Sequence, residues 1–385
     1  METAGILCEF NPFHLGHQRL VAYAHSLGAT VVCLMSGRYV QRGAPALFAP
    51  ELRAEAAVLG GADLVLELPL TAALSSAEGF AAGGVEIFTA LGLEAMVFGS
   101  ESGDAGQLLE LAALLQSDAL SGPLHRYLDQ GLSFPAARER AAQELGADAS
   151  LLRRPNSILA VEYCKAILAQ GSHLRPVVLL RPGDYHSPLP DAANPSATAL
   201  RQALLTGGPW ETMTPPSCHC LYRTGSKHTW QAGERAVLAR LRAMGQEEFE
   251  ALPYGGEGLW RKFYHACQRE TTLEAILGAT KSKRYSHTRL CRMAMCAFLG
   301  LTAQDMQKKS PYLRVLAFND RGRTLLRRLR ERKIPLCQAG QTMTGPYAQL
   351  EHRARALYGL FAQEVEAPGP AERVVYVRGC GDTLS

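Results

Sequence analysis

Residues 5–20, GILCEFNPFHLGHQRL, combine a short apolar run, a turn and the start of a helix. The run is typical of a buried strand, and a proline and a glycine mark the turn that follows it. His14 and His17 lie three positions apart, so both imidazoles share one face of the first helical turn. Unpaired backbone N–H groups and the helix dipole favour an anion there. This stretch therefore predicts a phosphate site.

Apolar strand-like runs alternate with helical patterns through residues 1–206. This alternation predicts an α/β fold whose N-terminal Rossmann-like parallel sheet carries helices on both faces. Ligands of such sheets bind at the carboxyl ends of the strands. The predicted strands are 4–8, 30–35, 63–68, 95–98 and 176–180, and a helix is expected after each of the first four.

The composition predicts a globular chain of two or three domains, because 47% of its 385 residues are apolar. Its ten cysteines show no disulfide framework, so reduced thiols and a cytoplasmic location are expected. We find neither an export signal nor an apolar stretch of the roughly eighteen residues needed to span a bilayer, so no membrane partner is expected. Cys218, His219 and Cys220 lack a second ligand pair at zinc spacing, and no metal ligands are predicted.

Charge is distributed unevenly along the chain. Residues 1–210 hold 13 Lys and Arg against 20 Asp and Glu, whereas residues 211–385 hold 27 against 16. Residues 281–333 alone contain 15 basic and 3 acidic residues, which predicts contact with a polyanion. Lys283, Arg284, Arg289 and Arg292 surround Tyr285 in a helical pattern, where they would either bind RNA or form a solvated helix face.

Polar or glycine-containing turns follow several predicted strands. Arg38 and Arg42, after the second strand, would clamp a phosphate or a carboxylate, or lie solvated in their loop. Gly99, after the fourth, would let the backbone approach an adenine or ribose, with polar contacts from Ser100 and Glu101, or the segment would form an ordinary turn. Asn156 lies at a helix start and would contact a ligand or act only as a cap.

A second phosphate element is predicted at residues 196–201, SATALR. Ser196 would cap a helix, and Arg201 would lie about one and a half turns further along it. Together with the His-x-Gly-His tetrad, this element resembles the paired signatures of nucleotidylyltransferases. The same tetrad also resembles that of class I aminoacyl-tRNA synthetases.

Eight motifs make the whole chain similar to the bacterial tRNA(Met) cytidine acetate ligases. They are EFNPFHLGH, MSGRYVQRGAPA, DLVLELP, FGSESGD, RRPNSIL, SATALR, SKRYSHTRLCR and PYLRVLAFNDRGR. The resemblance implies that acetate and ATP form acetyl-adenylate and pyrophosphate, after which the acetyl group passes to N4 of the wobble cytidine of elongator tRNA(Met). Leu15 stands where relatives often carry Asn, and Arg38 where a His is common.

The resemblance also implies particular roles along the chain. His14 and His17 are the catalytic candidates, and Mg²⁺ is expected to accompany ATP. ATP contacts are expected at Leu7, Cys8, Glu9, Phe10, Asn11, Pro12, Phe13, His14, Leu15, Gly16, His17, Gln18, Arg19, Leu20, Gly99, Asn156, Arg181, Ser196 and Arg201, and RNA contacts at Lys283, Arg284, Arg289 and Arg292. The expected organisation is a nucleotidyltransferase-like ATP-binding domain at 1–206, a linker at 207–217 and a basic, mainly helical tRNA-binding region at 218–385.

Two other functions fit parts of the sequence. One is a nucleotidylyltransferase that acts on a small phosphorylated substrate, and the other is a tRNA-binding protein without chemistry. The basic region argues against the first, because a small substrate does not require it. The presence of His14, His17 and Arg201 argues against the second.

Overall fold

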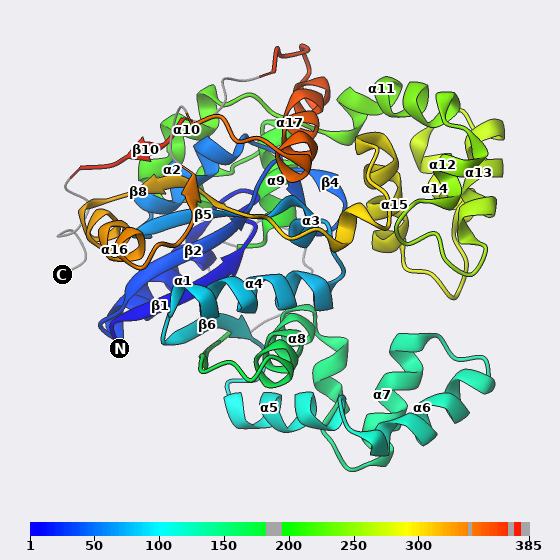
Figure 1. Cartoon of the computed structure of the whole chain (residues 1–385), viewed down its shortest axis with the longest axis horizontal. Helices are drawn as coiled ribbons and strands as arrows, with labels where there is room; N and C mark the ends of the chain where they lie inside the picture. Colours follow the sequence, from blue (N-terminus) through cyan, green and yellow to red (C-terminus); the bar gives the residue numbers. More distant parts are fainter. Residues whose placement is uncertain (182–194, 338–340, 369–372, 379–385) are drawn as a thin grey trace.

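The computed structural model describes residues 1–181, 195–337, 341–368 and 373–378. Its main sheet has the strand order β10-β8-β5-β2-β1-β6-β7, with β9 paired to β8. Five neighbouring strands are parallel and match the five predicted ones (Figure 1). They are β1 (Thr3–Cys8), β2 (Thr30–Ser36), β5 (Leu64–Leu68), β6 (Ala95–Ser100) and β7 (Arg175–Leu180).

Successive residues of these strands point to opposite faces of the sheet. In β2, for example, Val32 and Leu34 belong to one core, and Val31 and Cys33 to the other. The first core includes α4 (Ala77–Leu91), α8 (Pro155–Ala169) and α16 (Asp320–Glu331), and the second includes α1 (Leu15–Ser26), α2 (Pro50–Leu59) and α9 (Ala197–Thr206). The predicted α/β fold with helices on both faces is confirmed.

Strands from the C-terminal half complete this sheet. They are β8 (Leu313–Phe318), β9 (Leu336–Cys337) and β10 (Val375–Tyr376). β8 runs antiparallel to β5, with Leu64 opposite Phe318. It covers an edge that would otherwise expose unpaired backbone groups. The sheet is therefore mixed, a pairing that local sequence patterns do not reveal because its two strands are far apart in the chain.

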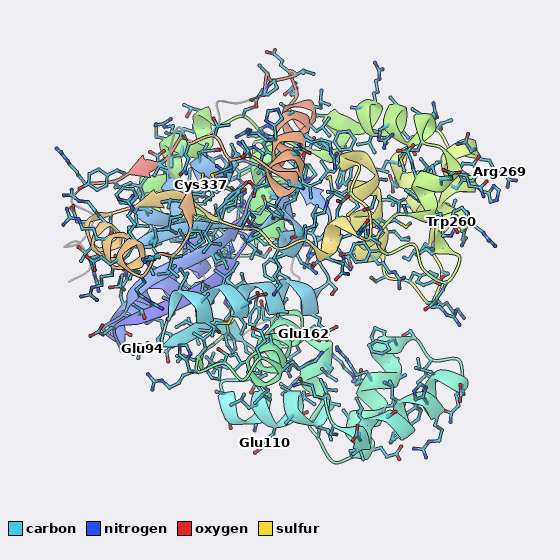
Figure 2. All side chains as sticks on the ribbon, in the orientation of Figure 1. Glu94, Glu110, Glu162, Trp260, Arg269 and Cys337 are labelled. Carbon is cyan, nitrogen blue, oxygen red and sulfur yellow. The ribbon has the colours of Figure 1, made fainter. Side chains whose placement is uncertain are left out.

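Most of the C-terminal half is helical, as predicted, and most of its helices pack around a third core that also includes Tyr39 and Leu74. Its helices are α10 (His219–Thr224), α11 (Trp230–Ala243), α12 (Gln246–Glu250), α13 (Leu259–Arg269), α14 (Leu273–Thr280), α15 (His287–Leu299) and α17 (Pro346–Tyr358). We call α11–α15 the helical lobe. Figure 2 places Trp260 and Arg269 of α13 in this lobe, well away from Glu110 of α5 (Ala105–Leu114).

The remaining elements are short or peripheral. They are β3 (Tyr39–Val40), β4 (Ala44–Pro45), α3 (Leu70–Ala73), α5 (Ala105–Leu114), α6 (Asp118–Asp129) and α7 (Phe134–Glu144), with 3-10 turns at Ala149–Arg153, Glu211–Met213, Pro216–Cys218, Asp305–Gln307 and Gly359–Phe361. None of the helices in the described ranges is long and apolar enough to cross a membrane.

The segment 207–217, expected to be a linker, is packed against the sheet domain. Trp210 and Met213 are buried in the same core as α1, α2 and α9. Proline and glycine content alone does not distinguish a free linker from an irregular segment held by a few large apolar side chains. The division of the chain at this segment stays a prediction.

Candidate active site

His14 lies at the carboxyl end of β1 and is the N-cap of α1. Its Nδ1 accepts a hydrogen bond from the backbone N–H of Gly16 at 3.1 Å. His17 makes the reciprocal contact, because its Nδ1 accepts from the backbone N–H of His14 at 3.3 Å. The helix terminus thus fixes the orientation of both rings.

The two imidazoles are stacked and electrically neutral. Their ring centroids lie 3.6 Å apart, with an interplanar angle of 24°. Burial lowers the pKa of His14 well below its usual range, and the charges of Arg181, Arg201 and Arg19 lower it further. Burial, then His14 and Arg181, lower the pKa of His17 in the same way. Because each Nδ1 accepts a hydrogen bond, each neutral ring carries its proton on Nε2.

The Nε2 atom of His14 is a buried donor that has no hydrogen-bond acceptor within the described part of the chain. Leaving such a group unsatisfied costs about 1–3 kcal/mol, and most buried polar groups in native proteins are paired. Phe10 and Phe13 line the neighbouring side of His17, with ring centroids at 4.9 and 5.8 Å. An oxygen of a bound anion would satisfy the His14 donor.

Arg181 connects the ends of β7, β6 and α1. Its Nη2 donates to the carbonyl oxygen of Gly16 at 3.2 Å. Its side chain crosses Gly99, where a Cβ would lie 2.6 Å from the Arg181 Cδ, and a Cβ on Gly16 would lie 2.9 Å from the His14 Cε1. Both glycines thus admit neighbouring side chains at close range. A contact of Gly99 with adenine or ribose stays a prediction.

Asn156 lies in the first turn of α8 and binds the carboxylate of Glu101. Its Nδ2 donates to Glu101 Oε1 at 2.8 Å, while the backbone N–H and Oγ of Ser157 donate to Oε2 at 2.8 and 2.7 Å. Although burial alone would raise the pKa of Glu101, these hydrogen bonds hold it below its usual value. Glu101 thus holds the first turn of α8, and a contact of its carboxylate with a nucleoside stays a prediction.

The second phosphate element contacts the first. Ser196 caps α9 by accepting from the backbone N–H of Ala199 at 3.0 Å. Arg201 donates through Nη1 to the carbonyl oxygen of Asn11 at 2.7 Å and through Nη2 to Thr198 Oγ1 at 3.2 Å. Residues 182–194, which precede this element, lie outside the described residues.

Several side chains of the stretch 7–20 stabilise the loop itself and do not lie on its surface. Asn11 Oδ1 accepts from the backbone N–H of Leu47 at 2.7 Å, and Glu9 Oε1 accepts from that of Gln41, also at 2.7 Å. Leu7, Cys8, Phe10, Phe13 and Leu20 are core residues, whereas Leu15, Gly16, His17 and Gln18 are half-buried and Arg19 is exposed. Ligand contacts from the core positions would use backbone atoms.

Arg53 of α2 organises this edge of the sheet and was missed by sequence reasoning. Its guanidinium is fully buried and donates to the carbonyl oxygens of Phe48 at 2.9 Å, Glu9 at 2.5 Å and Ser36 at 2.9 Å, and also to that of Gly37. One side chain therefore holds the end of β1 against the end of β2. In the sequence, this role is indicated only by the position of an arginine within the otherwise apolar face of a helix.

The four predicted RNA contacts differ in exposure. Lys283 and Arg284 are exposed just before α15, and Arg289 is half-buried. Arg289 donates through Nε and Nη2 to the carbonyl oxygen of Tyr254, at 3.0 and 2.9 Å. Its guanidinium carbon lies 4.7 Å from the ring centroid of Tyr285.

Arg292 does not belong to an exposed basic surface. Its side chain is buried, stacks over Tyr254 at 5.0 Å, and donates to the carbonyl oxygen of Gln41 at 3.3 Å. The prediction that Arg292 contacts RNA phosphate does not fit this position. The helical spacing that placed it beside Arg289 does not report which face of α15 is buried.

The basic stretch 281–333 forms two separate surfaces. Lys283 and Arg284 belong to the helical lobe, whereas α16 lies at the opposite side of the molecule (Figure 1). α16 runs along the amino edge of the sheet, since Arg321 donates to Ala29 before β2 at 3.2 Å and Arg332 to Leu91 before β6 at 2.6 Å. Because the strands of the sheet are about six residues long, its amino and carboxyl edges lie about 20 Å apart.

A metal held by the polypeptide alone finds no support in the described ranges. We find no group of three or more His, Cys, Asp or Glu side chains there that could hold an ion. The neutral histidines at the start of α1 use their Nδ1 atoms for backbone contacts. Their arrangement suits anion binding.

Comparisons with known proteins agree with this geometry. A sequence profile described as HIGH Nucleotidyl Transferase matches residues 1–370. The tRNA(Met) cytidine acetate ligase of Clostridium novyi is 32% identical over 87% of this chain and 89% of its own. That of Caldicellulosiruptor saccharolyticus is 35% identical, over 86% of each chain.

Solved structures extend the match to three dimensions. The apo crystal structure of Thermotoga maritima TmcAL superposes with a TM-score of 0.88 at 27% identity, over 98% of this chain and all (100%) of that one. The same protein bound with alpha-thio ATP gives a TM-score of 0.85. The chain therefore belongs to the HIGH nucleotidyl transferase family and, within it, to the tRNA(Met) cytidine acetate ligases.

Proposed function

We propose that this protein is an ATP-dependent ligase that activates acetate as acetyl-adenylate and acetylates N4 of the wobble cytidine of elongator tRNA(Met). In the first step an acetate oxygen attacks the α-phosphorus of ATP, and the bond to pyrophosphate breaks. In the second step the cytidine amine attacks the acetyl carbon, AMP leaves, and the amine loses a proton. The names of the curated relatives support this reaction.

The observation on which the proposal rests is the buried Nε2–H of His14, stacked beside the neutral ring of His17. Charge grows on the phosphoryl oxygens and on the departing pyrophosphate during adenylation. Fixed donors aimed at those oxygens stabilise the transition state. Arg181 and Arg201 lie close enough to lower the pKa of His14, so they add positive charge to the same site.

A nucleotide would lie across the carboxyl ends of β1, β6 and β7. In this arrangement the phosphates contact the start of α1, while the nucleoside lies toward Gly99 and Asn156. Mg²⁺ would bind through the phosphates of ATP, since the described residues offer no group of acidic ligands. The crystal structure of Thermotoga maritima TmcAL with alpha-thio ATP supports ATP as the substrate.

The helical lobe is the proposed tRNA-binding region. Arg292 and Gln41 link α15 to the loop after β2, so the exposed Lys283 and Arg284 belong to a lobe anchored beside the nucleotide site. We place the reaction in the cytoplasm, where tRNA is modified and cysteines stay reduced.

Two measurements test the function together. The purified protein should catalyse acetate-dependent exchange of pyrophosphate into ATP, and with tRNA it should produce N4-acetylcytidine that mass spectrometry of digested nucleosides detects. Exchange that requires a phosphorylated small molecule instead of acetate would favour the alternative nucleotidylyltransferase. RNA binding without any exchange would favour a protein that lacks chemistry.

A further inference from the structure

A small cavity lies at the carboxyl ends of β2 and β5, beside the nucleotide site. It has a volume of about 40 Å³, is partly open to solvent, and is lined by Arg38 and by Leu70 and Ala73 of α3, among others. By the same measure, a single water molecule requires roughly 10–15 Å³. The space therefore suits a molecule of about four non-hydrogen atoms, and a pyrimidine base is too large for it.

The cavity is held next to the ATP-binding loop by a buried side chain. The guanidinium of Arg53 donates both to the carbonyl oxygen of Gly37, which lines the cavity, and to that of Glu9, which follows β1. In addition, the Gln41 backbone N–H donates to Glu9 Oε1 at 2.7 Å. These hydrogen bonds connect the lining of the cavity to the loop that follows β1.

Arg38 supplies the charge that a carboxylate requires. Its Nη2 donates to Glu51 at 3.0 Å, and we find no other hydrogen-bond acceptor for this guanidinium within the described residues. A guanidinium has five N–H donors, so the donors that Glu51 does not use suit bidentate recognition of an anion. Leu70 and Ala73 supply an apolar part of the lining, which matches a methyl group.

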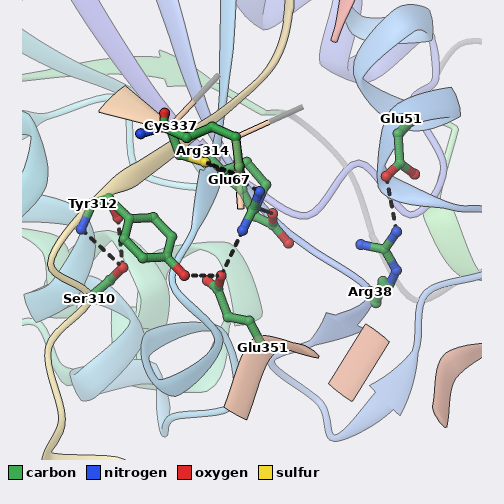
Figure 3. A network of polar contacts seen from close by, with 9 residues as sticks. Arg38, Glu51, Glu67, Ser310, Tyr312, Arg314, Cys337 and Glu351 are labelled. Carbon is green, nitrogen blue, oxygen red and sulfur yellow. Dashed lines mark hydrogen bonds and ion pairs between the residues drawn. The ribbon is translucent and has the colours of Figure 1, made fainter. Parts of the chain in front are cut away.

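Glu67, Arg314 and Glu351 also line the cavity. Arg314 Nε lies 3.3 Å from Glu67 Oε2, and its Nη2 lies 2.9 Å from Glu351 Oε2. Figure 3 shows Arg314 between these two carboxylates, with the hydroxyl of Tyr312 donating to Glu351. The Arg314 charge is thus shared by two acids. Arg355 also lines the cavity and donates to His352 Nδ1 at 3.1 Å, so we assign Arg38 as the guanidinium that binds the ligand.

From this geometry we propose that the cavity is the subsite for acetate, with Arg38 binding the carboxylate and Leu70 with Ala73 enclosing the methyl group. The inference rests on the proposed function and extends it by assigning the site of the acid. The small size of the cavity also predicts a preference for a two-carbon acid over longer ones.

Replacing Arg38 tests the carboxylate contact. Arg38→Met should raise the KM for acetate in ATP–pyrophosphate exchange roughly 10- to 100-fold, the effect of losing a hydrogen bond to a charged group. The KM for ATP should stay within about twofold of the wild-type value. Arg42→Met is the matched control, because Arg42 is an exposed arginine in the same loop that does not line the cavity.

Enlarging the cavity provides a gain of function that misfolding does not produce. Leu70→Ala should raise the ratio of kcat/KM for propionate over that for acetate by roughly 10-fold or more, the usual effect of one methylene in an apolar pocket. An unchanged ratio would overturn the assignment of the methyl pocket.

The outcomes separate the two proposals. A wild-type protein without acetate-dependent exchange overturns the proposed function itself. A wild-type protein with normal exchange, combined with equal acetate KM values for Arg38→Met and Arg42→Met, overturns only the subsite. A parallel rise in the KM values for acetate and ATP in Arg38→Met also overturns it, because Arg38 would then serve the nucleotide.

Discussion

The imidazole of His17 stacks on that of His14 with ring centroids 3.6 Å apart, and the Nδ1 of His17 accepts a hydrogen bond from the backbone N–H of His14. The pair thus combines helix capping with presentation of two Nε2–H donors. Neutral rings suit this task, because their donor state does not change across the physiological pH range. Burial lowers the pKa of each histidine and maintains that state.

Capping and phosphate binding by His14 can be separated by mutation. His14→Asn retains a side-chain oxygen able to accept from the Gly16 N–H, but it removes the buried Nε2 donor. We expect ATP–pyrophosphate exchange to fall roughly 10²- to 10³-fold in both His14→Asn and His14→Ala. The midpoint of thermal unfolding should fall further for the alanine variant. Near-normal exchange in the asparagine variant would contradict the phosphate role.

The contact of Arg181 with the start of α1 predicts a selective loss of nucleotide binding. Arg181→Met should weaken ATP affinity in calorimetry by roughly 10-fold or more, as expected when a charged hydrogen bond is removed. Affinity for free tRNA should not change, because the helical lobe is intact. Gly99→Ala should have a similar effect, since its Cβ would meet the Arg181 Cδ at 2.6 Å. Reduced tRNA affinity with normal ATP binding would show that Arg181 has another role.

The two basic surfaces predict different responses to salt. Lys283→Ala with Arg284→Ala should make the slope of log affinity for tRNA against log salt shallower by about one for each phosphate that the protein no longer neutralises. Arg323→Ala with Arg327→Ala removes the same charge from the exposed face of α16, at the amino edge, and should change the slope little. Filter binding at several salt concentrations provides both slopes. If only the α16 variant flattens the slope, tRNA binds at the other edge.

The acetate subsite predicts a pH dependence from Glu67. Burial and then Glu351 of α17 raise its pKa to about 7, with Glu51 of α2 adding to the shift and with Arg314 of β8 and Arg38 opposing it. Glu67 is therefore mostly protonated near pH 6 and able to donate to acetate. Above about pH 7 it is ionised and repels the anion. The KM for acetate should rise between about pH 6 and about pH 8 in the wild type.

Glu67→Gln supplies the control for this dependence, because glutamine preserves shape and cannot titrate. Its KM for acetate should be nearly constant over the same range. The KM for ATP serves as the reference in both proteins. A wild-type acetate KM that is independent of pH would exclude Glu67 from the subsite.

The sequence sufficed for features that local patterns encode. Apolar runs bounded by turns located the five parallel strands, and the spacing of His14 and His17 correctly placed both rings at a helix start. It did not reveal Arg53 or the buried position of Arg292, because the environment of an arginine depends on which distant segments surround it.

The antiparallel pairing of β8 with β5 has a consequence for biosynthesis. A ribosome that has released only the first half of the chain has produced the five parallel strands, yet the outer edge of β5 has no partner until residues 313–318 emerge. During this interval the nascent protein carries an open edge that can pair with other chains. The helical lobe is translated in the same interval. Because both ends of the helical lobe connect to the same sheet, movement of the lobe relative to the sheet on binding tRNA is restricted.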